Sequence, residues 1–288
     1  VCSSDLNKTT TFIHKLRENI LNNDLQLRIK SLPPLPESVQ KIQEICNNPE
    51  SGIADLVKVV EKDPMLTANL LKAANSPLYG FSREIKTVSQ AISLFGMATV
   101  KGFALASAVR NTLTIDMSPY GIDTKQFANV AQLQSALMIN WYPKVNRHMM
   151  NILAPASFLD GLGQIIMASE LIKQNKGSEF KNKVDISETV EEPEAETFEM
   201  TSPTVSAGVF DHWRFEQLMI DAIKFSDEPE TADEEIRPYS IALKIVRTAV
   251  NVKAQLSDES VANAVALVEE FGLDKDKFLE AVTVVRDV

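Results

Sequence analysis

The stretch DPMLTANLLKAANSPLYG, residues 63–80, has a clear helix start and a clear helix stop. Asp63 can accept hydrogen bonds from the free N–H groups of a first turn, and Pro64 suits the first helical position, where a missing N–H costs nothing. Asn75 and Ser76 can bond the loose backbone groups at the other end, where the chain turns. We therefore expect these four residues to act on stability and not on chemistry.

The composition is that of an ordinary globular protein. The 288 residues suffice for one large domain or two modest ones, and 44% of them are hydrophobic. A net charge of -10 and a pI near 5.0 argue against broad binding of nucleic acid or anionic membranes. Two cysteines, no signal-peptide pattern and no run of eighteen apolar residues predict a cytoplasmic protein without a membrane span.

The spacing of apolar residues predicts an all-α fold. Glycine is scarce at 10 residues, and apolar positions recur every three or four residues instead of alternating. The predicted helices are one marked by Phe12, Ile13, Leu16 and Ile20, one with Val39, Ile42 and Ile45 after SLPPLP (31–36), and others at 53–60, 63–75, 88–95, 98–113, 127–141, 156–171, 205–225 and 239–256, with a last pair after Ser257.

One segment breaks the helical pattern. NKVDISETVEEPEAETFEM, residues 182–200, is acidic and has no periodicity. Such segments bury too little apolar surface to offset the entropy of ordering them. We expect a mobile, solvated loop that is dispensable for folding and is cut first by proteases.

The residues that most often carry catalysis are sparse. His14, His148 and His212 form no metal-binding spacing, and Cys2 and Cys46 occupy a terminus and the end of an apolar helical stripe. No phosphate-binding glycine loop and no nucleophile motif is present. The sequence therefore predicts no cofactor.

A helix-turn-helix is the one weaker motif. Residues 87–106 contain two helical stretches around a glycine, with Lys101 on the second. That second helix is otherwise dominated by residues suited to burial, such as Val100, Phe103 and Leu105, and no basic surface accompanies it. We expect no nucleic-acid binding.

The first half of the chain resembles the HDOD domain, a bacterial signalling module related to the HD metal-dependent phosphohydrolases. The resemblance rests on LPPLP (32–36), EKDPMLTANLLKAANSPLYG (61–80) and AISLFG (91–96), in that order and spacing, and runs from about residue 27 to 229. The family signature comprises Asp63, Pro64, Asn75, Ser76, Tyr79 and Gly80.

The resemblance implies a helical bundle in which an N-terminal lobe packs on an HD-like lobe. The expected organisation is an N-terminal helix at 1–26, an HDOD-like domain at 27–229 and a C-terminal helical extension at 230–288. Within the domain, the N-terminal lobe covers 27–115 and the HD-like lobe 122–229.

The metal-ligand places that the resemblance implies hold other residues here. FLDGLGQII (158–166) resembles the stretch around the His-Asp pair, and it places Asp160 at the His and Gly161 at the Asp. A carboxylate moved by one helical step turns about 100° away from the former ligand direction. Ser202, and the pair Ser226 and Asp227, stand at the later histidine places, so at most two carboxylates are expected to converge.

Hydroxyls and carboxylates without imidazoles make a poor transition-metal site. The sequence therefore indicates a non-enzymatic signalling or regulatory protein that acts through a protein partner. A phosphohydrolase or cyclic-dinucleotide phosphodiesterase that uses Asp160 and Asp227 with atypical ligands is the enzymatic alternative. A sensor that binds a nucleotide second messenger at the degenerate pocket without cleaving it is a third.

Overall fold

The computed structural model describes residues 23–81 and 83–287, and within those ranges every regular element is a helix. An isolated bridge between Val250 and Gln255 is the only β-type pairing recorded there. The predicted all-α fold is therefore confirmed. The helix expected from Phe12 to Ile20 lies outside the described residues.

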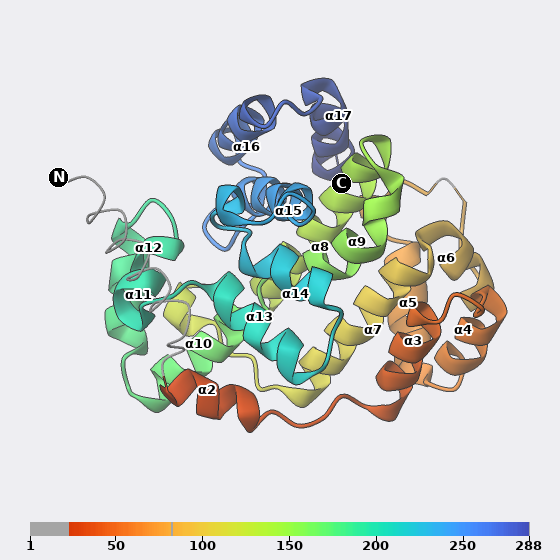
Figure 1. The fold of residues 1–288 in the computed structure, drawn as a ribbon, viewed down its shortest axis with the longest axis horizontal. Coiled ribbons are helices and arrows are strands. Elements are labelled where there is room, and N and C mark those ends of the chain that lie inside the picture. Colours follow the sequence, from red (N-terminus) through yellow and green to blue (C-terminus); the bar gives the residue numbers. More distant parts are fainter. Residues whose placement is uncertain (1–22, 82, 288) are drawn as a thin grey trace, which may run out of the picture.

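The first part of the chain forms a small helical lobe at the right of Figure 1. Its α3 packs on α4 and α7, while α6 packs on α4, α5 and α7. Gly96, with φ +81°, separates α6 from α7, which meet at 113°. The helices of this lobe are α3 (Glu37–Asn47), α4 (Ile53–Val60), α5 (Pro64–Ala74), α6 (Val88–Phe95) and α7 (Met97–Thr112). The preceding α2 (Asn23–Lys30) lies apart from it and packs on two helices of the second half of the chain.

The predicted caps of α5 are present. The Asp63 carboxylate accepts a hydrogen bond from the Leu66 N–H at 3.0 Å, and Pro64 is the first residue of the helix. At the other end, the Asn75 side chain accepts from the N–H of Ile85 and donates to its carbonyl, both at 2.8 Å. Asn75 thus ties the end of α5 to the segment that leads into α6.

The rest of the signature shapes the turn after α5. Ser76 precedes a 3-10 helix, Pro77–Tyr79, but its side chain makes no capping bond. Tyr79 is buried, with its ring centroid 4.9 Å from that of Phe95. Gly80 has φ +66°, a left-handed conformation that side chains disfavour.

The proline-rich connection between α2 and α3 runs along the lower edge of the molecule in Figure 1. His212 Nε2 lies 3.2 Å from the carbonyl oxygen of Leu32, and the Trp213 indole donates to the carbonyl of Pro33 at 3.1 Å. His212 is accordingly a packing residue, as its isolation in the sequence suggested.

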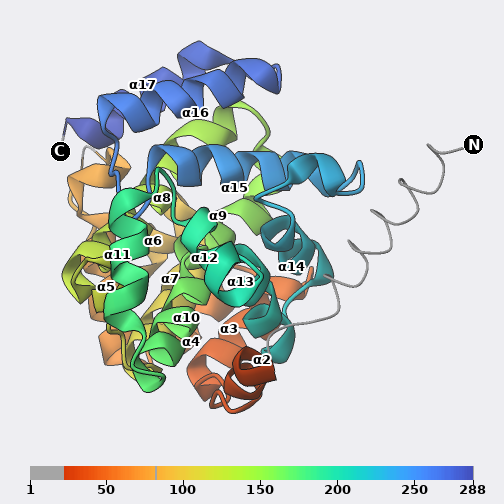
Figure 2. The same ribbon diagram turned by 90° about the vertical axis from the view of Figure 1, so that its left-hand side faces the viewer.

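The second half of the chain surrounds α9, which packs between α7 and α8. Helix α15 crosses α8, α9 and α14, and Figure 2 shows α16 and α17 stacked beyond it. The helices are α8 (Thr124–Trp141), α9 (Met150–Leu159), α10 (Leu162–Lys173), α11 (Gly177–Ile186), α12 (Glu191–Phe198), α13 (Ser202–His212), α14 (Gln217–Lys224), α15 (Arg237–Ala249), α16 (Asp258–Glu270) and α17 (Lys275–Arg286). Short 3-10 helices lie at Ser118–Tyr120, Tyr142–Lys144, Arg147–Met149 and Pro229–Thr231.

Four predicted segments differ in the structure. The helix expected at 205–225 is two helices, α13 and α14, and the one expected at 239–256 ends at Ala249. The helix expected at 156–171 is broken at Asp160 and Gly161 into α9 and α10. The acidic segment 182–200 is not a solvated loop, because it contains the end of α11 and all of α12. Glu194 and Phe198 of α12 are buried, so α12 is docked on the core.

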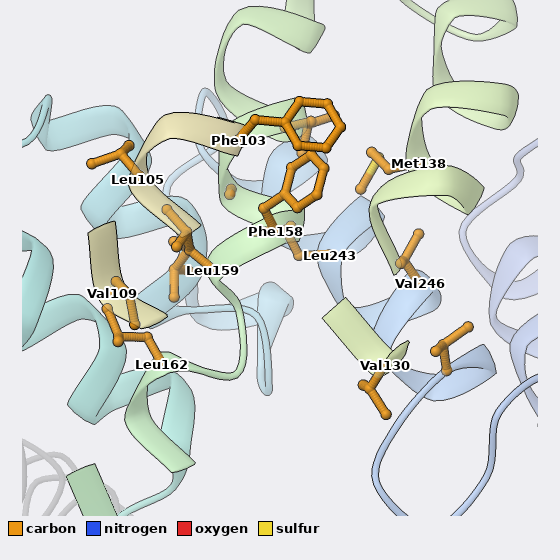
Figure 3. Packing of buried hydrophobic residues seen from close by; sticks show 14 of the residues in the cluster. Phe103, Leu105, Val109, Val130, Met138, Phe158, Leu159, Leu162, Leu243 and Val246 are labelled. Atoms are coloured by element: carbon orange, nitrogen blue, oxygen red, sulfur yellow. The ribbon is translucent and has the colours of Figure 1, made fainter. Parts of the chain in front are cut away.

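The two lobes share one core. Phe103 of α7 and Phe158 of α9 face each other with ring centroids 4.3 Å apart, and Leu159 lies beside them (Figure 3). The backbones also approach closely, since a Cβ on Gly102 would lie 2.8 Å from the Cα of Pro155. The α7 and α9 crossing thus joins the N-terminal lobe to the HD-like lobe.

Helix α7, on which the sequence placed the possible recognition helix, is buried over most of its length. Its Lys101 is only 3% exposed and forms an ion pair with Glu216. A buried, neutralised lysine cannot contact a phosphate backbone.

Taken together, the 3-10 helix at Arg147–Met149, α9 and α10 make a stretch, Arg147–Lys173, that is long and apolar enough to cross a membrane. The bent pair α6 and α7 passes the same test together. The most apolar window of the first stretch is 89% buried inside the protein. Burial of that kind is typical of core helices.

Candidate functional site

The ends of several helices meet where the resemblance places the metal ligands. Asp160 ends α9 and Gly161 precedes α10, while Ser202 begins α13. Ser226 and Asp227 lie in the turn after α14. Three of these five residues, Asp160, Ser226 and Asp227, contact the side chain of an arginine from the C-terminal extension.

Arg247 of α15 bonds to three of these residues. Its Nη1 donates to Asp160 Oδ1 at 3.0 Å and to Oδ2 at 3.1 Å, and also to Ser226 Oγ at 2.9 Å. Its Nη2 donates to an Asp227 carboxylate oxygen, and its Nε lies 3.6 Å from Glu191 Oε1. We refer to Arg247, Asp160, Ser226, Asp227 and Glu191 as the Arg247 cluster.

Charge balance holds the guanidinium in its protonated form. Arg247 is only 8% exposed, and burial lowers its pKa, but the carboxylates of Asp160, Asp227 and Glu191 outweigh burial and raise the pKa overall. Burial raises the pKa of Asp160, and contact with Arg247 opposes that rise. The expectation of at most two converging carboxylates was wrong, because α12 contributes Glu191 as a third.

Glu194 forms a second polar layer behind the cluster. Its Oε1 accepts a hydrogen bond from the Tyr120 hydroxyl at 2.9 Å, and its Oε2 accepts from the Ser202 N–H at 2.7 Å. Burial, reinforced by the nearby charge of Glu191, raises the pKa of Glu194 to about 8. Ser202, at a former histidine place, therefore binds this layer through its backbone.

Close packing fills the place that the resemblance assigns to the metal-binding aspartate. A Cβ on Gly161 would lie 2.9 Å from Cζ of Phe127, so a longer side chain requires that ring to move. A Cβ on Gly163 would lie 2.0 Å from the carbonyl oxygen of Ser202. Glycine at 163 therefore sets how closely α10 approaches α13.

The donors present do not fit a catalytic metal. In residues 23–81 and 83–287, no group of three or more His, Cys, Asp or Glu side chains is placed to hold an ion. His148 is exposed, and burial raises the pKa of the Cys46 thiol to about 11. The carboxylates of the Arg247 cluster are engaged by a guanidinium, which takes the role that a cation has in a metal site.

A cavity of about 470 Å³ adjoins the cluster. It runs between α5, α7, α8 and the junction of α9 and α10, and reaches Asp160, Gly161, Ser202 and Arg247 at its inner end. Two residues of the signature, Ser76 and Tyr79, also line it. The cavity thus connects the signature turn with the degenerate site.

Sequence reasoning missed Arg247, Glu191, Glu194 and Tyr120. A signal for two of them exists in the periodicity. Arg247 follows Ser240 and Leu243 along one buried face of α15, and Glu194 stands four residues from both Val190 and Phe198. A single charge at an apolar position of a helix indicates a buried, paired group.

Comparison with known protein families matches the HDOD domain over residues 32–229, well over half of the chain. The chain belongs to the HDOD family. Arg247 lies beyond the matched range, so a residue of the C-terminal extension completes the centre of the HD-like lobe.

Solved structures share the fold of this HDOD protein. A virulence factor from Campylobacter jejuni subsp. jejuni is 27% identical, with a TM-score of 0.59 over 93% of this chain and 96% of that one. A protein from Shewanella amazonensis, provisionally named a phosphohydrolase, is 18% identical, with a TM-score of 0.66 and coverage of 90% and 93%. A provisionally named signal transduction protein from Marinobacter aquaeolei is 22% identical, with a TM-score of 0.60 over 89% of this chain and 60% of that one.

A curated relative from Treponema pallidum (strain Nichols), described as uncharacterized, is 31% identical over 70 residues. The match spans 24% of this chain and only 14% of that protein.

Proposed function

We propose that this HDOD protein is a non-enzymatic signal-transduction protein whose HD-like lobe is a scaffold that acts through a protein partner. The observation that carries the proposal is the bonding of Arg247 to both Asp160 and Asp227. Family membership and the name of the Marinobacter aquaeolei protein, a provisionally named signal transduction protein, agree with a role in signalling.

The enzymatic alternative needs the same two carboxylates as metal ligands. Asp160 bonds Arg247 through both oxygens, and Asp227 accepts from Arg247 and from Thr201 Oγ1. A divalent ion would have to displace a buried guanidinium, and the vacated charge would then lie unpaired in the core. A hydrolytic site further requires open coordination positions around several strong ligands.

The proposal is tested first by elemental analysis of protein purified without chelator. Assays on cyclic dinucleotides and generic phosphodiesters with added manganese accompany it. We expect neither stoichiometric metal nor turnover. Bound iron or manganese, with an activity that Asp160→Asn and Asp227→Asn each abolish while the helical circular dichroism is retained, would overturn the proposal.

The partner is sought by cross-linking and pull-down from the native cell with the full chain. We expect a protein that co-purifies in a fixed ratio and is retained by Asp160→Asn, because the proposal assigns no chemistry to that carboxylate. Loss of the partner in Lys62→Gln, an exposed change away from the cluster, would indicate non-specific charge attraction.

A further inference from the structure

We propose that the cavity between α5, α7 and α8 binds a small organic anion with a largely apolar body, whose negative group lies at Lys72 and Arg110. Metal-dependent hydrolysis in an HD-like site does not depend on this cavity. The inference rests on the proposed signalling function in one respect only: the ligand would be the signal that the protein detects. Ligand binding itself is measured without a partner protein and without a phosphoester assay.

The cavity has the size and walls of a small-molecule site. Its volume of about 470 Å³ lies within the range of roughly 300–1,000 Å³ that is usual for ligand pockets. Aromatic rings of Phe103, Phe127 and Phe158 form part of the wall. Four alanines from three helices leave the space open; they are Ala73 of α5, Ala106 of α7, and Ala128 and Ala131 of α8.

The cavity lining has more basic than acidic side chains, although the protein as a whole is acidic. The chain has 39 acidic and 29 basic residues, yet the cavity is lined by three basic side chains and one acidic side chain. The acidic one, Asp160, is bound by Arg247. Lys72 and Arg110 therefore remain the uncompensated charges of the lining.

Lys72 and Arg110 stand at the cavity mouth, because each side chain is exposed and also lines the cavity. Within the described ranges neither makes an ion pair or a side-chain hydrogen bond. Partial burial lowers the pKa of Arg110, in agreement with the absence of a counter-charge beside its guanidinium. An incoming anion would provide that counter-charge.

The inner end of the cavity cannot hold the anionic group. Arg247 is the only cation of the lining there, and three carboxylates already surround it. Another negative charge would meet repulsion from Asp160 and its neighbours. The ligand must therefore enter with its charged group outward, at α5 and α7.

Gln164 offers a polar contact near the inner end. Its side chain is only 6% exposed, lines the cavity, and has no hydrogen-bond partner among the described residues. An amide that faces a cavity can bond to water or to a polar group of a ligand. We therefore expect the ligand to carry a hydrogen-bonding group at the end opposite its charge.

Two negative groups fit this chemistry on an alkyl chain of medium length: a carboxylate and a phosphate monoester. Isothermal titration calorimetry on the full chain with decanoate, 10-hydroxydecanoate and decyl phosphate distinguishes them, and decanol tests the need for charge. We expect 1:1 binding of one charged class and none of decanol. For the carboxylate class, 10-hydroxydecanoate should bind more tightly than decanoate.

The site is located with matched variants. Replacing both mouth cations, Lys72→Gln with Arg110→Gln, should weaken binding about tenfold. The control pair, Lys62→Gln with Arg83→Gln, removes the same charges outside the lining and should leave affinity unchanged. If both double variants lose the same affinity for the ligand, the effect comes from net charge alone. That result would overturn the placement of the ligand's negative group at Lys72 and Arg110.

The body of the ligand is tested by filling the cavity. Ala128→Phe, or the smaller change Ala106→Leu, should abolish binding while circular dichroism and melting show a folded protein. Gln164→Leu should remove any preference for the hydroxylated acid. No binding by any charged probe, or binding that a folded filling variant does not disturb, would overturn the inference and leave the signalling proposal to its own tests.

Discussion

The signature turn and the Arg247 cluster are both built from polar side chains, but they are assembled over very different distances along the chain. Asp63 caps a helix three residues away, and Asn75 bonds Ile85 ten residues away. Arg247 instead bonds Asp160 across 87 residues. The turn stabilises a local shape, whereas the cluster joins the C-terminal extension to the centre of the HD-like lobe.

This difference predicts the largest effect for Arg247→Met. The substitution leaves Asp160 buried without its partner, and removing one member of a buried ion pair typically costs about 3–5 kcal/mol. Urea denaturation should show a loss of that order in the free energy of unfolding. Arg83→Met, at an exposed residue outside the cluster, should change it by less than about 0.5 kcal/mol.

A double variant sharpens the interpretation. Asp160→Asn combined with Arg247→Met removes the stranded charge, so it should be more stable than Arg247→Met alone. If the two changes in free energy of unfolding are simply additive, Arg247 and Asp160 are not energetically coupled. Arg247 then does not act as the cation that holds the cluster together.

Gly163→Ala should have the next largest effect. Alanine normally favours a helix interior over glycine, but here its Cβ would meet the Ser202 carbonyl at 2.0 Å. Overpacking of this kind costs about 1–3 kcal/mol, measurable as a lower midpoint in urea. Gly177→Ala, whose Cβ would lie 3.4 Å from Pro119, should be nearly neutral.

Glu194 should make stability fall as pH rises. Its folded pKa of about 8 lies above the ordinary glutamate value of 4.5, so the folded protein keeps a proton that the unfolded chain releases. The contribution is complete below pH 4.5 and is lost between pH 4.5 and about 8, by up to about 1.4 kcal/mol per pH unit.

Glu194→Gln keeps the shape and removes the titration, so its free energy of unfolding should vary less over that pH range. Glu192→Gln, at an exposed residue of the same helix, should retain the wild-type slope. A wild-type slope in Glu194→Gln would assign the pH dependence to other groups, such as Asp160.

The same contrast explains what the sequence could predict. Helix starts and stops depend on residues that are neighbours in the sequence, so the caps of α5 and the turn at Gly96 were predicted correctly. The break at Asp160 and Gly161 was not, because it depends on Phe127 and α13. The acidic segment was interpreted wrongly because the cation that binds Glu191 lies 56 residues later in the chain.

The sequence predicted which residues of the HD-like lobe meet at the candidate site, but not the arginine that binds them. The resemblance named Asp160, Ser226 and Asp227, and the structure brings all three to one arginine. Arg247 lies outside the family match, where no motif pointed to it. Only its place on the buried face of α15 indicated a partner.

The smallest expected effect belongs to Asp63→Ala in the signature turn. The substitution removes the bond from the Leu66 N–H and the contact from Ser38 Oγ at 3.2 Å, and loss of an N-cap typically costs about 1 kcal/mol. Thermal melts should show a small decrease, and Asp63→Asn, which can still cap, should recover most of it. An unchanged melt together with lost partner binding would make this turn a recognition surface, and the contrast between a structural turn and a functional lobe would be reversed.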